Sequence, residues 1–168
     1  MRRAIRTMTS NEMRGVNSTA VLELIRTDGP ISRSEIATKL AVSLPTAMRI
    51  VEELVQSKLV IPTGKKEKSG GRKRTLLAFN AEEHLVIGVD MGPESLYGAV
   101  ADLSGKILVE HTEHHGLAGV AVYDHLENLI AYLLKSTEQT EKQVRGICVG
   151  APGITFYDEG VVKWAPSL

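Results

Sequence analysis

Apolar residues recur at helical spacing in two neighbouring segments near the start of the chain. In the first segment, Ile36, Ala37 and Leu40 share one face. In the second, the residues at this spacing are Ala47, Ile50, Val51, Leu54 and Val55. Ala41 and Val42 separate the segments, and we expect Val42 to fill the angle between them. The pattern predicts two short helices joined by a tight turn.

Both helices have suitable residues at their starts. Ser32 precedes Glu35 by three residues, the spacing of a capping box, in which each side chain accepts a hydrogen bond from a free backbone N–H. Ser43 is an N-cap candidate for the second helix, and Pro45 lies in its first turn, where a missing N–H costs nothing. Residues 29–60 are therefore typical of a helix-turn-helix, although an αα-hairpin in a helical bundle has the same pattern.

In a helix-turn-helix the second helix enters the major groove of DNA, with its N-terminal residues at the base edges. The side of this helix opposite its apolar face carries Leu44, Thr46, Met48 and Arg49. We predict four residues that face DNA: Ser43, Leu44, Thr46 and Arg49. Of these, Arg49 is the best donor to guanine.

The flanking segments complete a small domain. Residues 17–27 carry Val21, Leu22 and Ile25 on one face and predict a first helix, whereas residues 1–13 have no sustained period and are expected to be a frayed lead-in. This first helix would supply the third wall of the small core that a helix-turn-helix needs.

Two short β-prone runs, residues 59–62 and 75–79, follow the second helix and flank a glycine-bearing loop, residues 64–74. The loop contains six cations: Lys65, Lys66, Lys68, Arg72, Lys73 and Arg74. Alone, such a run is usually a solvated linker, but after a helix-turn-helix it predicts a β-hairpin wing. We expect the cations to contact phosphates, and Arg72, which follows two glycines, to enter an adjacent minor groove.

Charge divides the chain into two halves. Residues 1–80 contain 15 Lys and Arg against 7 Asp and Glu, whereas residues 81–168 contain 5 against 13. A basic half suits a polyanion, which would repel the acidic half. We therefore predict two domains, with 1–80 a winged helix-turn-helix DNA-binding domain.

The second half has the pattern of a sheet. Apolar runs predict three strands, a helix and a fourth strand, at residues 85–89, 96–101, 107–111, 120–137 and 144–149. The order β-β-β-α-β predicts an α/β domain with a mixed sheet and a crossover helix.

Other features argue against membrane and metal roles. No apolar run approaches a membrane span and no secretory segment follows the N-terminus, so we expect a cytoplasmic protein. The one cysteine, Cys148, is expected to be a buried, inert thiol. His111, His114, His115 and the nearby His125 fit no zinc spacing, and we expect a solvated strand end instead of a metal site.

Several short motifs occur in a characteristic order: Ser43-Leu44-Pro45-Thr46, Ser69-Gly70-Gly71-Arg72, Ile87-Gly88-Val89-Asp90-Met91-Gly92, Gly150-Ala151-Pro152-Gly153, Gly160-Val161-Val162 and Ala165-Pro166-Ser167-Leu168. In this order they resemble the repressors of the ROK family (repressor, open reading frame, kinase), over nearly all 168 residues. The resemblance implies that residues 81–168 are the N-terminal portion of a sugar-kinase-like domain with the actin/hexokinase-like, or ribonuclease H-like, mixed-sheet fold of ATPases.

The resemblance stops short of kinase chemistry. Kinases of this family carry Asp-x-Gly-Gly-Thr in the first hairpin of this domain, where it cradles phosphate and helps to hold the metal. The turn here keeps Asp90 and Gly92, with a displaced hydroxyl at Ser95. Pro93 removes an N–H donor, and Glu94 places a negative charge where phosphate would lie. We expect a degenerate phosphate turn and no enzymatic activity; the alternative is an ATP-dependent hexose kinase with an appended DNA-binding domain.

The resemblance also implies an effector site. Pro152 and Gly153 resemble the loop beside the sugar in this family, although Pro-Gly forms strand-end turns anywhere. The chain ends at Leu168, roughly midway through the family's pattern, which indicates a fragment or a truncated relative. We expect no metal and no cofactor in this chain, with a structural zinc implied only for the missing C-terminal part.

Together these patterns predict a sequence-specific DNA-binding transcriptional regulator, and specifically a sugar-responsive repressor of carbohydrate-metabolism genes. The expected partners are a double-stranded DNA operator, a sugar or sugar-phosphate effector that needs the missing part, and further copies of the chain. A homodimer would place two recognition helices in successive major grooves, about 34 Å apart. A further alternative is a plain winged-helix DNA binder whose acidic half only dimerises.

Overall fold

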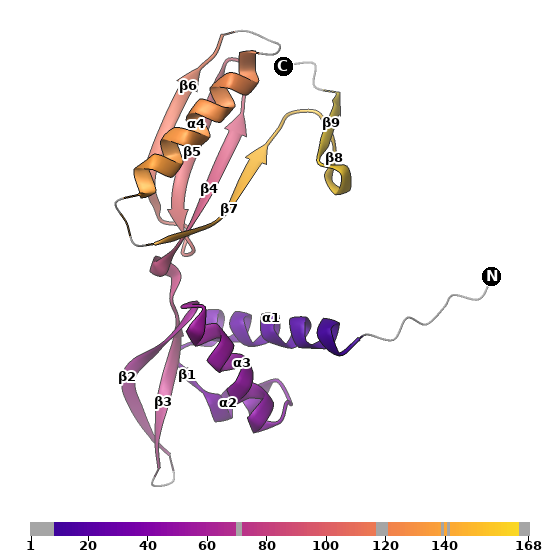
Figure 1. Cartoon of the computed structure of the whole chain (residues 1–168). Helices are drawn as coiled ribbons and strands as arrows, with labels where there is room; N and C mark the ends of the chain where they lie inside the picture. Colours follow the sequence, from indigo (N-terminus) through magenta and orange to yellow (C-terminus); the bar gives the residue numbers. More distant parts are fainter. Residues whose placement is uncertain (1–8, 70–71, 117–120, 139, 141, 165–168) are drawn as a thin grey trace, which may run out of the picture. The chain divides into compact units, whose positions relative to one another are not determined.

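The computed structural model describes residues 9–69, 72–116, 121–138, 140 and 142–164 (Figure 1). The chain divides into two compact units, Met1–Asn80 and Ala81–Leu168. Each unit has its own hydrophobic core. Among the described helices, none has the length and apolar character required to cross a membrane.

Helices and a small sheet make up the first unit. Its elements are α1 (Ser10–Asp28), β1 (Ile31–Ser32), α2 (Arg33–Lys39), α3 (Leu44–Gln56), β2 (Val60–Ser69) and β3 (Arg72–Phe79). The strands pair antiparallel in the order β1-β3-β2. Val21 and Ile25 of α1, Ile36 of α2, Ile50 of α3 and Leu77 of β3 are buried together. The predicted winged helix-turn-helix is confirmed.

Local interactions at the helix ends explain the fold of the helix-turn-helix. The Ser32 backbone N–H donates to Glu35 Oε2 at 2.9 Å, and the Glu35 N–H donates to Ser32 Oγ at 3.4 Å, which completes the predicted capping box. Ser43 caps α3 as predicted. Between the helices, Ala41 has a φ of 51°, in the left-handed region that makes a sharp turn, and the half-buried Val42 packs on the core.

Two predictions for this unit were wrong in extent. α1 begins at Ser10 and not at residue 17, because Thr9 and Glu12 form a second capping box. The basic segment 64–74 is mostly not a loop, since the β2–β3 ladder continues to the pair Ser69–Arg72. A register shift after Pro62, with Gly64 at a φ of 71°, absorbs the extra residues of β2 and lets pairing resume.

A mixed sheet dominates the second unit. Its elements are η1 (Ala81–Glu83), β4 (His84–Met91), β5 (Ser95–Asp102), β6 (Ile107–His114), α4 (Ala121–Thr137), β7 (Gln143–Gly150), β8 (Ile154–Phe156), η2 (Tyr157–Glu159) and β9 (Val161–Trp164). The sheet order is β6-β5-β4-β7, with β7 parallel to β4 and the other pairs antiparallel. This confirms the predicted mixed sheet and crossover helix. The separate β8–β9 pair was not predicted.

α4 packs on β5 and β6, and Leu129 and Leu133 are fully buried in this contact (Figure 1). Gly98 of β5 allows the close approach, because a Cβ there would lie 2.7 Å from Leu133 Cδ1. β7, at the edge of the sheet, is almost wholly exposed. Cys148 is therefore exposed, and the prediction of a buried thiol was wrong.

The histidine run is only partly solvated. His111 and His114 are exposed, but His115 is 8% exposed, with its Nε2 3.2 Å from the Gly92 carbonyl oxygen. His125 Nδ1 lies 2.6 Å from Glu113 Oε1. A solvated strand end was thus the wrong expectation for His115, which contacts the β4–β5 turn. The described residues contain no group of three or more His, Cys, Asp or Glu side chains that could hold a metal ion.

Candidate nucleic-acid interface

The exposed side of α3 is the candidate recognition surface. Its core-facing residues, Ala47, Ile50, Val51 and Leu54, are buried, which fixes the rotation of the helix. Leu44 and Met48 are 46% and 47% exposed, and Pro45 and Arg49 are also exposed. The first two turns of α3 therefore present mainly apolar side chains, with Arg49 as the nearby cation.

Two of the predicted DNA-facing residues already take part in the helix cap. The Thr46 N–H donates to Ser43 Oγ at 3.2 Å, and the two hydroxyl oxygens lie 2.7 Å apart in a second hydrogen bond. Thr46 is half-buried. These hydroxyls thus hold the start of α3 in place.

Arg49 is also engaged within the protein. Its Nη1 lies 3.3 Å from Glu53 Oε1, one helical turn further along α3. The same oxygen accepts a hydrogen bond from Arg14 Nη2 of α1. Exposed pairs of this kind contribute little stability, but they direct the guanidinium group toward the C-terminal half of α3. The guanidinium group carries five N–H donors, so the pair with Glu53 uses only part of the donor capacity of Arg49.

The wing supplies the remaining predicted cations. Lys65, Lys66 and Lys68 lie on β2 and Arg72 and Lys73 on β3, and the ladder places Lys68 opposite Lys73. The side chains of these five residues lie outside the described part, as do Gly70 and Gly71 between the strands. Arg74 is described and half-buried. It lies at the root of the wing, which is the part of β3 (Arg74 and Thr75) just beyond Leu76, where the pairing with β1 ends.

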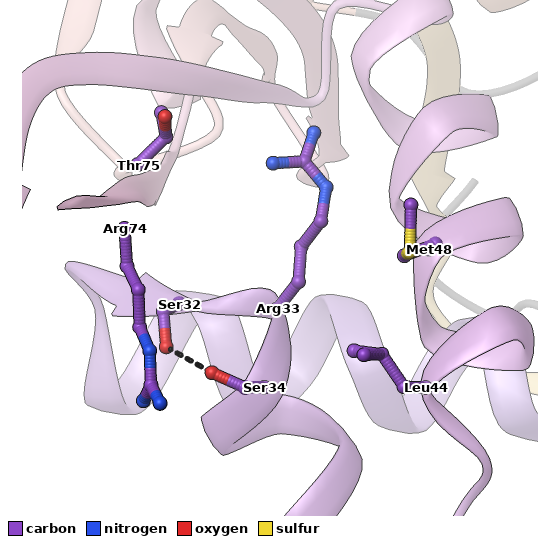
Figure 2. A pocket seen from close by; sticks show the side chains of 7 residues that line it. All are labelled: Ser32, Arg33, Ser34, Leu44, Met48, Arg74 and Thr75. Carbon is purple, nitrogen blue, oxygen red and sulfur yellow. Dashed lines mark hydrogen bonds between the residues drawn. The ribbon is translucent and has the colours of Figure 1, made fainter. Parts of the chain in front are cut away.

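A cavity of about 340 Å³ joins the root of the wing to the helix-turn-helix. Figure 2 shows its lining: Ser32, Arg33, Ser34, Leu44, Met48, Arg74 and Thr75. Leu44 and Met48 point from α3 toward Arg33, and Arg74 lies on the other side of Arg33 (Figure 2). The cavity therefore has an apolar wall on α3 and a cationic wall on α2 and β3.

Charge at the cationic wall is partly balanced by Glu35. Hydrogen bonds from Ser32 hold the pKa of Glu35 below its ordinary value, and the positive charges of Arg74 and Lys39 lower it further. Among the described residues that line the cavity beside α3, Arg33 and Arg74 are the charged ones, and Glu35 is not part of the lining.

Five residues of this cavity are not among the predicted DNA-binding residues: Ser32, Arg33, Ser34, Met48 and Thr75. Met48 was recognised as lying on the outer face of its helix but was not selected. Arg33 and Ser34 directly follow the N-cap residue Ser32, so their positions in the first turn of α2 could have been predicted from the sequence. Only the pairing of β1 with β3, which spans more than forty residues of sequence, brings Thr75 and Arg74 beside them.

The second unit holds the predicted degenerate phosphate turn. The Gly92 N–H donates to the Ser95 carbonyl at 2.9 Å, so this donor is used within the turn. The Glu94 carbonyl accepts from the His115 N–H at 3.1 Å. Asp90 is exposed on β4. On either side of Pro93, the Gly92 N–H and the Glu94 carbonyl are thus each paired with the protein's own backbone.

The predicted sugar-proximal loop lies near this turn along the sheet. β4 and β7 run parallel with Asp90 opposite Gly150, so both motifs follow the carboxyl ends of neighbouring strands. The face of the sheet opposite α4 carries a cavity of about 330 Å³. Its lining residues are Gly88, Val89, Asp90, Tyr97, Ala99, Cys148 and Gly150. Pro152 and Gly153 are not among its lining residues, and Gly153 has a φ of 104° in the turn before β8.

Known proteins are similar to this chain over both of its units. Residues 17–61 match a family model described as winged helix-turn-helix DNA-binding. The chain is 27% identical to the xylose repressor of Caldicellulosiruptor bescii, over 93% of this chain and 40% of that protein. It is 29% identical to the DNA-binding transcriptional dual regulator NagC of Escherichia coli, over 91% and 38% of the two chains.

A solved structure shares the fold across both units. It is described as a ROK family transcriptional regulator and homologue of the E. coli Mlc protein, and the match has a TM-score of 0.78 at 23% identity. The match covers 92% of this chain and 40% of that chain. The chain spans about 40% of the length of the curated relatives that it matches. The chain is thus similar in sequence to these repressors and regulators, shares the fold of the ROK-family structure, and has a winged helix-turn-helix in its first unit.

Proposed function

We propose that this protein is a sequence-specific DNA-binding regulator of transcription. The observation that carries the proposal is the start of α3, which is capped, exposed, and flanked by Arg33 and the wing root within the segment that matches a DNA-binding model. An N-terminal turn presented in this way fits the major groove. The basic wing would contact phosphates through Lys65, Lys66, Lys68, Arg72, Lys73 and Arg74.

We further propose that the complete protein is a repressor of carbohydrate-metabolism genes that responds to a sugar or sugar phosphate. Relatives named for xylose and N-acetylglucosamine repression support this proposal. The effector would bind the complete second domain, with Pro152 and Gly153 near the sugar, and would change operator affinity by its differential affinity for two states. Neither effector binding nor the change in operator affinity, as proposed, uses a cofactor bound by the residues of this chain.

Kinase activity is the alternative, and the turn after β4 weighs against it. The Gly92 N–H is used within the turn, Pro93 has no N–H, and Glu94 is exposed and negative. The relatives are named as repressors and regulators. We propose that the protein does not phosphorylate sugars. ATP consumption with a panel of hexoses tests this directly, and turnover above that of a protein-free control would overturn the proposal.

A DNA titration tests the regulator. The protein is titrated against promoter fragments of its genome at several salt concentrations, with and without xylose and N-acetylglucosamine. We expect tight binding to a few fragments and release by one sugar. Lys66→Ala is expected to weaken binding to all fragments about equally and to reduce the salt slope by about one. Equal binding to every fragment would contradict sequence-specific regulation.

A further inference from the structure

The first two turns of α3 expose two apolar side chains on one flank. Leu44 and Met48 are four residues apart, so they lie one above the other on the helix. They are 46% and 47% exposed, whereas the apolar residues on the core side of α3 are buried. Both line the cavity in Figure 2 and point into it. This pair is therefore available to contact a ligand.

The polar groups of the same turns are less available. Ser43 and Thr46 use their hydroxyls in the helix cap, where the two oxygens lie 2.7 Å apart. Arg49 pairs with Glu53, which also accepts a hydrogen bond from Arg14. Hydrogen bonding to bases by these groups would compete with interactions that they already make within the protein. Contact through Leu44 and Met48 involves no such competition.

The opposite wall of the cavity is cationic. Arg33 extends from the first turn of α2, and Arg74 extends from β3 beside it (Figure 2). Among the described residues that line this cavity, none carries a carboxylate. An apolar wall facing a cationic wall is complementary to the edge of a DNA duplex, in which base edges in the major groove lie next to the phosphates.

We propose that Leu44 and Met48 read thymine in the operator. Thymine is the base that carries a methyl group in the major groove, and apolar side chains recognise it there. Leu44 and Met48 would each contact a C5-methyl group, while Arg33 and Arg74 contact the flanking phosphates. The inference rests on the proposed DNA-binding function and specifies its chemistry, since it assigns base reading to this apolar pair and not to Arg49.

Deoxyuridine substitution isolates the methyl group. A preferred site is first selected from random double-stranded DNA with the protein itself. Each thymine of the site is then replaced singly by deoxyuridine, which pairs identically and lacks only the methyl. We expect about a three- to fivefold loss of affinity at each contacted position, the value for removing one buried methyl group, and no change elsewhere.

Variants assign each contact. Leu44→Ala and Met48→Ala should each abolish the difference between thymine and deoxyuridine at one position, whereas Arg49→Ala should preserve the difference at both. Met48→Leu keeps an apolar side chain and should retain it. Because both side chains are exposed, thermal unfolding should show each variant folded as the parent.

The outcomes separate the inference from the function on which it rests. If the protein selects a defined site but binds every deoxyuridine-substituted version equally, thymine reading is wrong and the regulator proposal stands. Loss of the thymine preference in Arg49→Ala alone would also overturn it. If no site is selected from the random DNA, the proposed function itself fails.

Discussion

The negative charge of Glu35 contributes to the capping box that stabilises the first unit. Its Oε2 accepts hydrogen bonds from the Ser32 N–H at 2.9 Å and from Ser32 Oγ at 2.6 Å. Ser32 itself is 1% exposed, so these partners are shielded from water. The hydrogen bonds favour the ionised carboxylate, which is why the pKa of Glu35 lies below its ordinary value of 4.5.

Acid should therefore destabilise the first unit through Glu35. Because its pKa is lower in the folded than in the unfolded state, Glu35 adds stability above pH 4.5 that is lost as the pH falls through the folded-state pKa. We expect Glu35→Gln to lower the free energy of unfolding at neutral pH by about 1 kcal/mol and to reduce its pH dependence. Urea unfolding between about pH 6 and pH 3 measures both effects.

Glu52→Gln is the matched control, because Glu52 is an exposed glutamate in the middle of α3. It should keep the parent's pH dependence. If both variants retain the same acid sensitivity, the cap does not carry the effect.

For single residues, the sequence predicted the interactions that form between residues a few positions apart in the chain. The capping box of Ser32 and Glu35 and the cap of Ser43 were readable from three-residue spacings. The position of Arg74 beside Ser34 was not, because it depends on the pairing of β1 with β3. Arg49 was assigned to guanine from its position on the helix. Its link to Arg14 through Glu53 required knowledge of how α1 packs.

Among the elements, α1 offers a direct test of backbone geometry. Gly15 lies in its middle, and a Cβ there would meet nothing within 4 Å. Gly29 is its C-cap, and its N–H donates to the Ile25 carbonyl at 3.0 Å. A Cβ on Gly29 would lie 2.4 Å from the same Ile25 oxygen, a backbone atom that cannot turn aside.

Alanine at these two glycines should have opposite effects. Gly15→Ala is expected to stabilise the protein by about 0.5–1 kcal/mol, because alanine loses less backbone entropy in a helix. Gly29→Ala should destabilise it by about 1–3 kcal/mol, since the end of α1 must shift away from its buried contacts. Thermal unfolding of the two variants beside the parent gives the comparison. Equal melting temperatures would contradict the geometry at Gly29.

The elements themselves were predictable where periodicity was strong. α2, α3, α4 and the sheet strands β4 to β7 follow from apolar spacing. β1 has two residues and β8 has three, too short for any period to appear. The wing was underestimated because its basic residues lack β-prone character, whereas cross-strand pairing extends it to Ser69 and Arg72. The start of α1 at Ser10 was missed although Thr9 and Glu12 have capping spacing.

Over the whole molecule, two units with opposite charge each have their own core. Val21, Ile25 and Ile50 belong to the first core, and Leu96 and Leu129 to the second. Asn80 completes the first unit, because its backbone N–H donates to the Leu59 carbonyl at 2.9 Å. Residues 1–80 therefore contain the hydrogen bonds and apolar contacts described for the winged helix-turn-helix.

A protein of residues 1–80 should fold and bind DNA. We expect one cooperative unfolding transition, and tighter non-specific DNA binding than that of the 168-residue chain at low salt, because the acidic half no longer repels phosphate. Circular dichroism during heating and a salt titration with random-sequence DNA measure these properties. Absence of cooperative unfolding would show that the first core needs the second unit, and equal DNA affinity would exclude repulsion by the acidic half.

The exposed position of Cys148 makes the second unit accessible to selective chemistry. It is the one cysteine among these 168 residues and lies on the edge strand β7. A maleimide dye would therefore attach at one place per chain and leave the DNA-contacting surface unlabelled. In an assembly of two chains, paired spin labels at this thiol would report one inter-chain distance.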